Sequence, residues 1–151
     1  MENHSKCQIL IFVIWLLRML PKKHRLVKQS DISKTLKSRH RAFFDGINLI
    51  ARDHKVTSYR PGFRNLVVIS KKIHKRAVIR NSLRRQFNAI FEGLHASDKL
   101  PCNLDCIIIL KDKTCIDLKI TEHYNKFIVS QLNRFSKLAA TPQKPTKAPI
   151  H

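Results

Sequence analysis

Apolar side chains recur along this chain at two different periods, and these periods predict its elements. Between residues 79 and 94 the spacing is three or four positions, which is typical of one face of a helix. That face comprises Ile79, Leu83, Phe87, Ile90 and Leu94. A second helical stripe follows Thr121, which we expect to cap the helix, and ends at Leu138. The sequence therefore predicts two long amphipathic helices.

Shorter segments show the patterns of β-strands. Residues 47–52 alternate in polarity, as expected of a half-buried strand, whereas residues 66–69 and 105–110 are nearly continuous apolar runs. Residues 60–63 carry Pro then Gly at the central positions expected of a type II turn. These patterns predict three strands.

A short helix is expected before the strands. Ser30 or Asp31 is a suitable N-cap, and the helix would run to about Lys37. The resulting order of elements is helix, strands, helix, strand, helix. We therefore expect an α+β sandwich, in which helices pack against a small, mainly antiparallel sheet.

The charge is high and concentrated in one segment. Thirty Lys and Arg against ten Asp and Glu give a formal net charge of +20. No acidic residue occurs between His54 and Phe91. A surface exposed only to solvent usually mixes both signs, so this segment is interpreted as a nucleic-acid contact.

Three arginines in this segment repeat at every fourth position. Arg76, Arg80 and Arg84 would repel one another on an isolated helix, and phosphate groups would offset that repulsion. Asn81 adds a neutral donor and acceptor between them.

The same segment resembles the RNR signature of the bacterial ribonuclease P protein family. The matching residues are Ser70-Lys71-Lys72, Lys75, Ala77, Val78, Arg80-Asn81, Leu83 and Arg84-Arg85. Upstream, His24-Arg25-Leu26 followed by Ser30-Asp31 also resembles the family. Ser82 departs from it, since a basic residue is common there. The resemblance covers residues 20 to 138.

The resemblance implies an αβββαβα fold with a left-handed crossover and a long basic central helix. It implies a subunit that binds a catalytic RNA and the 5′ leader of precursor tRNA, and that assists endonucleolytic removal of the leader. It further implies that Mg²⁺ ions held mainly by the RNA perform the hydrolysis, that the enzyme acts in the cytoplasm, and that no protein partner is required. The implied contacts to the RNA subunit are Lys75, Arg76, Arg80, Asn81, Arg84 and Arg85. The implied leader-cleft residues are Arg25, Ile32, Leu36, Ile50, Ser70, Lys71 and Lys72.

This chain departs from the family at three positions of that cleft. Ile32, Leu36 and Ile50 stand where the family often has aromatic residues, and they lack the stacking contribution of ~1 to 3 kcal/mol per base. Phe43 and Phe44 lie nearby, and the sequence leaves open whether they replace these aromatics or pack in the core.

Catalytic and metal-binding residues are not indicated in the protein itself. The ten carboxylates are scattered without a compact pair, and the histidines neighbour basic residues. Cys102 and Cys106 with His95 or His123 would form an irregular metal site, so buried core thiols are the favoured interpretation. We expect no catalytic residue and no metal site in the protein.

The two ends of the chain are expected to lie outside one domain spanning residues 19–138. Residues 9–17 are an apolar run shorter than a membrane span, and residues 1–18 are interpreted as an extension upstream of a start at Met19. Residues 139–151 are expected to form a disordered tail. Two alternatives remain: another basic RNA-binding protein, such as a ribosomal protein, or a membrane-associated protein anchored by residues 9–17. We expect no membrane partner.

Overall fold

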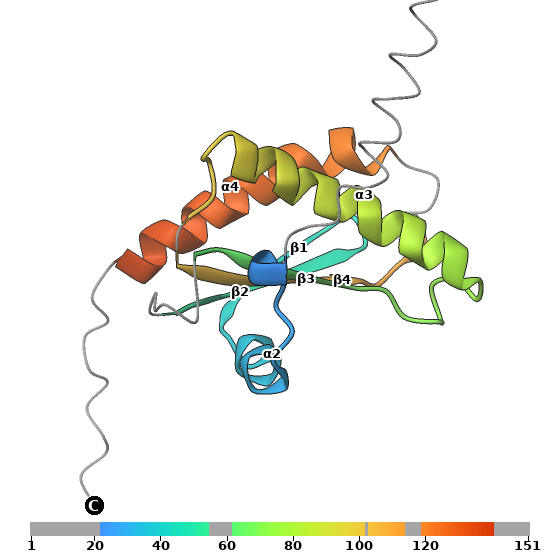
Figure 1. Cartoon of the computed structure of the whole chain (residues 1–151), viewed down its shortest axis with the longest axis horizontal. Helices are drawn as coiled ribbons and strands as arrows, with labels where there is room; N and C mark the ends of the chain where they lie inside the picture. The colour runs from blue at the N-terminus through green and yellow to red at the C-terminus, as the bar shows by residue number, and fades with distance from the viewer. Residues whose placement is uncertain (1–21, 55–61, 102, 114–118, 141–151) are drawn as a thin grey trace, which may run out of the picture.

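A four-stranded sheet forms the centre of the computed structural model, which describes residues 22–54, 62–101, 103–113 and 119–140. The elements in chain order are the 3-10 turn η1 (Lys22–His24), α2 (Gln29–Leu36), β1 (His40–Phe44), β2 (Ile47–Asp53), β3 (Arg64–Val68), α3 (Ala77–Ala96), β4 (Leu104–Leu110) and α4 (Ile120–Ala140). Helices α3 and α4 lie side by side on one face of the sheet, and α2 crosses the opposite face (Figure 1). The αβββαβα order and the α+β class are thus confirmed.

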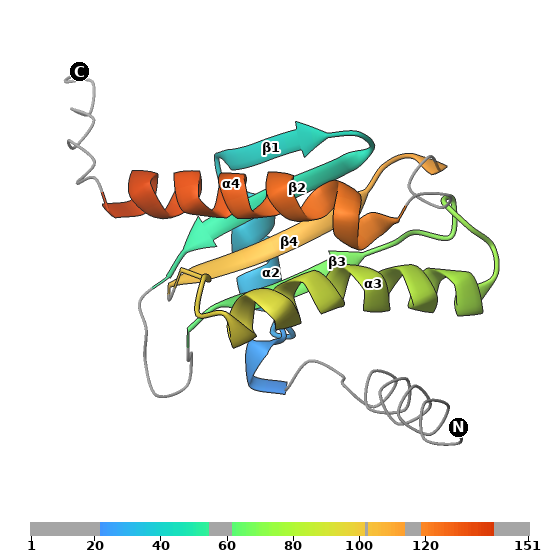
Figure 2. The same cartoon turned by 90° about the horizontal axis from the view of Figure 1, so that it is seen from above.

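The strands are arranged in the order β1-β2-β4-β3. Strands β1 and β2 pair antiparallel, as do β2 and β4, whereas β3 and β4 are parallel and are connected through α3. In Figure 2, α3 lies in front of the sheet, β3 and β4 both run from left to right, and β4 lies above β3. The crossover is therefore left-handed, which is rare for parallel strands.

The hydrophobic core lies between the sheet and the pair α3 and α4. The predicted stripe of α3 faces it: Leu83, Phe87, Ile90 and Leu94 are buried, and Ile79 packs at its edge. Alternate residues of β2 and β4 complete this layer from the sheet. Because the apolar face of α3 packs against the core, its cationic side chains lie on the other faces of the helix.

Two predicted helix caps are wrong. Lys28 occupies the N-cap of α2 and no side chain caps that helix, while Asp31 lies buried in its first turn. Helix α4 begins at Ile120, so Thr121 lies inside it. Asp31 instead accepts a hydrogen bond from Arg64 of β3. A buried carboxylate without a cationic partner would cost more free energy than a missing helix cap.

Strand β1 was not predicted from periodicity. It forms a hairpin with β2 through Asp45 and Gly46, whose positive φ angles of 42° and 78° suit a two-residue turn. As an edge strand, β1 exposes its residues more than the central strands do, so its polarity alternates weakly.

Cys106 is a buried free thiol, and burial raises its pKa far above the ordinary value. This confirms the core-thiol interpretation for Cys106, whereas Cys102 lies outside the described residues. The first two residues of the turn predicted over residues 60–63 also lie outside them, as do residues 1–18. Nearly all of the predicted tail lies outside them too, although α4 continues to Ala140. In the part of the chain that is described, no helix is long and apolar enough to cross a membrane.

Candidate nucleic-acid interface

Exposed cations surround the N-terminal half of α3. Lys75 and Arg76 precede the helix, and Arg85 lies on its third turn. All three are exposed, as is Asn81. The first turn of α3 contains no acidic residue. Four predicted contacts to RNA are therefore on the surface and available to phosphate groups.

Arg80 and Arg84 are half-buried and bind the protein's own backbone. Arg80 Nη1 donates to the carbonyl oxygens of His74 (2.9 Å) and Lys75 (2.6 Å). Arg84 Nε donates to the Val67 carbonyl (3.3 Å), and its Nη1 donates to Asn81 Oδ1 (2.8 Å). These two arginines fix the segment before α3 and the end of β3. The structure thus gives them a positioning role that the charge pattern alone did not indicate.

Arg80→Ala is expected to destabilise the folded protein modestly. It removes two hydrogen bonds to carbonyl oxygens, so we expect a loss of about 1 kcal/mol of unfolding free energy. Thermal or urea unfolding would measure it. Arg76→Ala is the matched control, because Arg76 is exposed and neighbours the same segment. Equal stability of the two variants would contradict this role for Arg80.

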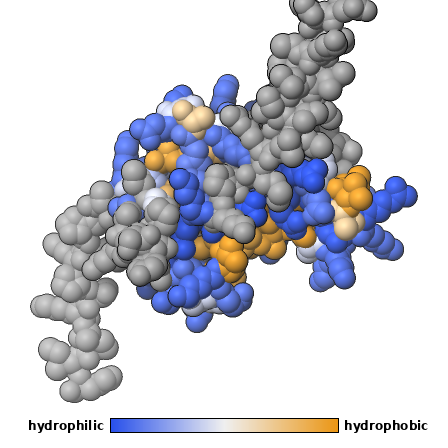
Figure 3. Space-filling view, in the orientation of Figure 1, coloured by the Kyte–Doolittle hydropathy of each residue, from blue (hydrophilic) through white to orange (hydrophobic). Residues whose placement is uncertain are grey.

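The sheet face that carries α2 contains an open row of side chains. Phe43, Asn48, Ile109 and Val68 are successive partners across all four strands. Phe43 is 68% exposed and Val68 is 37% exposed, with the other two half-buried. Figure 3 shows hydrophobic surface under the sheet beside α2. We refer to this open strip of the sheet beside α2 as the groove.

The predicted leader-cleft residues take different places around this groove. Ile32 is half-buried, Leu36 is 37% exposed, and both belong to α2. Ser70, Lys71 and Lys72 follow β3 and are exposed. Ile50 is wrong as a contact: at 2% exposure, in the row next to Phe43, it has no surface left for a base.

Arg25 lies at the outer edge of β3 and not in this groove. It forms a parallel bridge with Asn65 and lines a pocket of about 200 Å³ together with Arg84, Arg85 and Asn88. The pocket lies between the segment that precedes α2 and the cationic face of α3.

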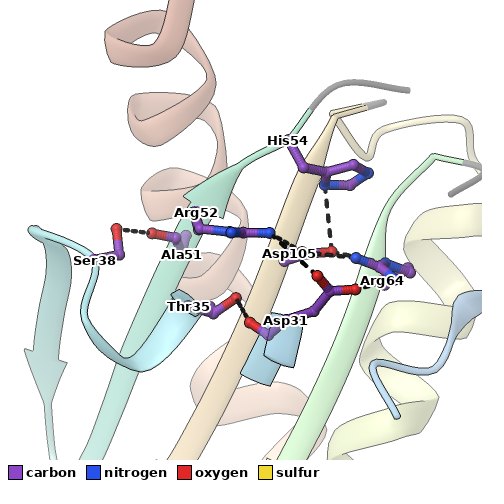
Figure 4. Close-up of polar contacts among 8 residues, drawn as sticks. All are labelled: Asp31, Thr35, Ser38, Ala51, Arg52, His54, Arg64 and Asp105. Carbon is purple, nitrogen blue, oxygen red and sulfur yellow. Dashed lines mark hydrogen bonds and ion pairs between the residues drawn. The ribbon is translucent and has the colours of Figure 1, made fainter. Parts of the chain in front are cut away.

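A buried charged cluster joins α2 to the sheet (Figure 4). Arg64 donates two hydrogen bonds of 2.8 Å to Asp105 and one of 3.2 Å to Asp31. Arg52 and His54 each lie 3.3 Å from Asp105. Burial alone would lower the pKa of Arg64, but hydrogen bonds and charge from Asp105 and Asp31 raise it, so the guanidinium stays charged. This cluster sets the position of α2 above the groove.

The buried carboxylates are unsuited to hold a metal ion. Asp31 and Asp105 are already neutralised by guanidinium groups. Within the described ranges, no three His, Cys, Asp or Glu side chains lie together in a way that suits a metal. The Mg²⁺ implied by the resemblance therefore does not fit any ligand set in this part of the protein.

Comparison with known proteins identifies similar sequences and folds. A family model described as Ribonuclease P matches residues 20–134. The ribonuclease P protein component of Pseudanabaena sp. (strain PCC 6903) is 36% identical over 78 residues, which are 50% of this chain and 63% of that protein. An RNase P protein structure from Staphylococcus aureus has a TM-score of 0.56 at 20% identity, covering 77% of this chain and 97% of that one. One from Thermotoga maritima has a TM-score of 0.50 at 19% identity, covering 76% and 96%.

Proposed function

Because this chain belongs to the ribonuclease P protein family, we propose that it binds the catalytic RNA of ribonuclease P and the 5′ leader of precursor tRNA. In this role it assists the Mg²⁺-dependent endonucleolytic removal of the leader, in the cytoplasm. The observation that carries the proposal is the pairing of two surfaces: the exposed cations around α3 and the open groove beside α2.

The two surfaces suit two kinds of RNA. Lys75, Arg76 and Arg85 offer charge without apolar contact, which suits the phosphate backbone of a folded RNA. The groove offers apolar side chains and an amide, with Lys71 and Lys72 at the end of β3, which suits unpaired bases. The proposal therefore assigns the catalytic RNA to α3 and the leader to the groove.

The hydrolysis itself is assigned to the RNA subunit. Asp31 and Asp105 are buried and bound to arginines, so neither is placed to activate water or to hold Mg²⁺. The protein's contribution is to bind and orient the substrate. Mg²⁺, when bound by the RNA, supplies the charge that activates the attacking water.

Purified protein added to a bacterial ribonuclease P RNA tests this function directly. We expect no cleavage of precursor tRNA by the protein alone, and increased cleavage by the RNA at low Mg²⁺ when the protein is present. A preparation free of nucleic acid that cleaves by itself would overturn the assignment of chemistry. Sequencing of RNA that copurifies with the protein distinguishes this function from a ribosomal one.

A further inference from the structure

Phe43 lies on the edge strand β1 with most of its ring exposed, and this position carries a further inference. We propose that Phe43, Asn48 and Ile109 form a subsite that stacks one unpaired base of single-stranded RNA. The inference rests on the proposed function and deepens it, because it places one leader nucleotide at the β1 edge of the groove. Its ligand is a nucleobase of the leader, bound by its face.

The strand geometry directs Phe43 and Phe44 to opposite faces of the sheet. The Phe44 ring stacks on Phe127 of α4 with 4.7 Å between ring centroids, so Phe44 belongs to the core side. Arg41, two residues before Phe43, donates through Nη2 to the carbonyl of Leu36, the last residue of α2. Residues two apart on a strand share a face, so Phe43 lies on the groove side.

The neighbours of Phe43 suit a base rather than a second apolar layer. Its partner across the strands is Asn48, which is half-buried and is followed across the sheet by Ile109. Phe43 is 68% exposed, so its ring offers a face on which a base can stack. The amide of Asn48 beside it offers a donor and an acceptor to the edge of that base. In the next row, by contrast, Ile50 and Ile107 are fully covered.

The charge around the row selects a nucleic acid as the occupant. Val68 ends both the row and strand β3, and the chain continues directly into exposed Ser70, Lys71 and Lys72. Lys37 and Arg39 are also exposed, but they precede β1 and lie at the opposite end of that strand from Phe43. A groove with an apolar floor and cations at its β3 end is complementary to a strand that carries bases and phosphates.

The position of Phe43 sets how far the RNA must reach. Strand β1 is three strands away from β3, which is a distance of about 14 Å across the sheet at the usual strand spacing. A leader that contacts Lys71 and Lys72 must therefore span this width of the sheet before it reaches Phe43. Ile32 and Leu36 of α2 lack aromatic rings, so the stacking of a leader base on an aromatic side chain depends on Phe43 of β1.

The first test measures holoenzyme affinity for precursor tRNA with a long leader and with a leader of one nucleotide. Phe43→Ala should weaken binding of the long-leader substrate by about 5- to 150-fold and leave the short-leader substrate unchanged. Phe43→Tyr should retain affinity. Leu138→Ala is the matched control, because Leu138 is 44% exposed and lies on α4, away from both proposed RNA surfaces. Equal loss on both substrates, or no loss on either, would overturn the subsite.

A second measurement detects the stacked base itself. The chain has one tryptophan, Trp15, so the variant Trp15→Phe with Phe43→Trp carries a single indole in the groove. Adding long-leader substrate to the holoenzyme should quench this fluorescence, and adding short-leader substrate should not. Unchanged fluorescence with normal long-leader cleavage would refute the subsite while leaving the proposed function intact. If the wild-type protein did not increase cleavage of precursor tRNA by the RNA, the proposed function would instead be refuted.

Discussion

Asp105→Ala is expected to lower the free energy of unfolding by about 3 to 5 kcal/mol, the usual cost of removing one partner of a buried ion pair. Asp105 is fully buried and accepts both hydrogen bonds of the bidentate contact from Arg64. It also lies within 3.3 Å of Arg52 and His54. Its removal would leave Arg64 and Arg52 with Asp31 as their remaining carboxylate in the described cluster. Urea unfolding followed by circular dichroism would measure the loss.

Asp53→Ala is the matched control for this change. Asp53 ends β2, one residue after Arg52, and its side chain is exposed. The same chemical change at an exposed site is expected to alter stability by less than about 0.5 kcal/mol. If Asp105→Ala were as stable as Asp53→Ala, the cluster would not be what holds α2 on the sheet.

The α3 side of the fold was predictable because its signals are local. The stripe from Ile79 to Leu94 requires only a helical period, and the observed helix contains it. The role of Asp31 was not predictable, because its partner Arg64 is 33 residues away and their contact depends on how α2 crosses the sheet. A carboxylate near the start of a helix has the same appearance in sequence whether it caps that helix or pairs elsewhere.

The interface was predictable in composition but not in the role of each residue. The charge pattern marked Arg76, Arg80 and Arg84 alike, and the structure leaves Arg76 exposed while Arg80 and Arg84 bind backbone carbonyls. Similarly, Phe43 and Phe44 are equivalent until the alternation of β1 is known. That alternation is fixed by pairing with β2, which brings Phe44 opposite Ile47 of the core.

Removing the three exposed cations around α3 is expected to have the largest effect on RNA binding. The triple change Lys75→Ala, Arg76→Ala and Arg85→Ala should weaken affinity for the ribonuclease P RNA by about 100- to 500-fold near 0.1 M salt, if each side chain neutralises about one phosphate. The slope of log affinity against log salt should fall in magnitude by about two to three units. Filter binding over a range of salt concentrations measures both.

The control must remove the same charge from another face of the protein. Lys126, Arg134 and Lys137 are exposed on α4, so replacing these three by alanine changes the net charge equally. A loss of affinity that arose only from the overall charge would be the same in both triple variants. A loss that arises from contacts should be confined to the α3 variant, with thermal unfolding of both variants close to wild type. Equal salt slopes for the two variants would therefore show that α3 does not face the RNA.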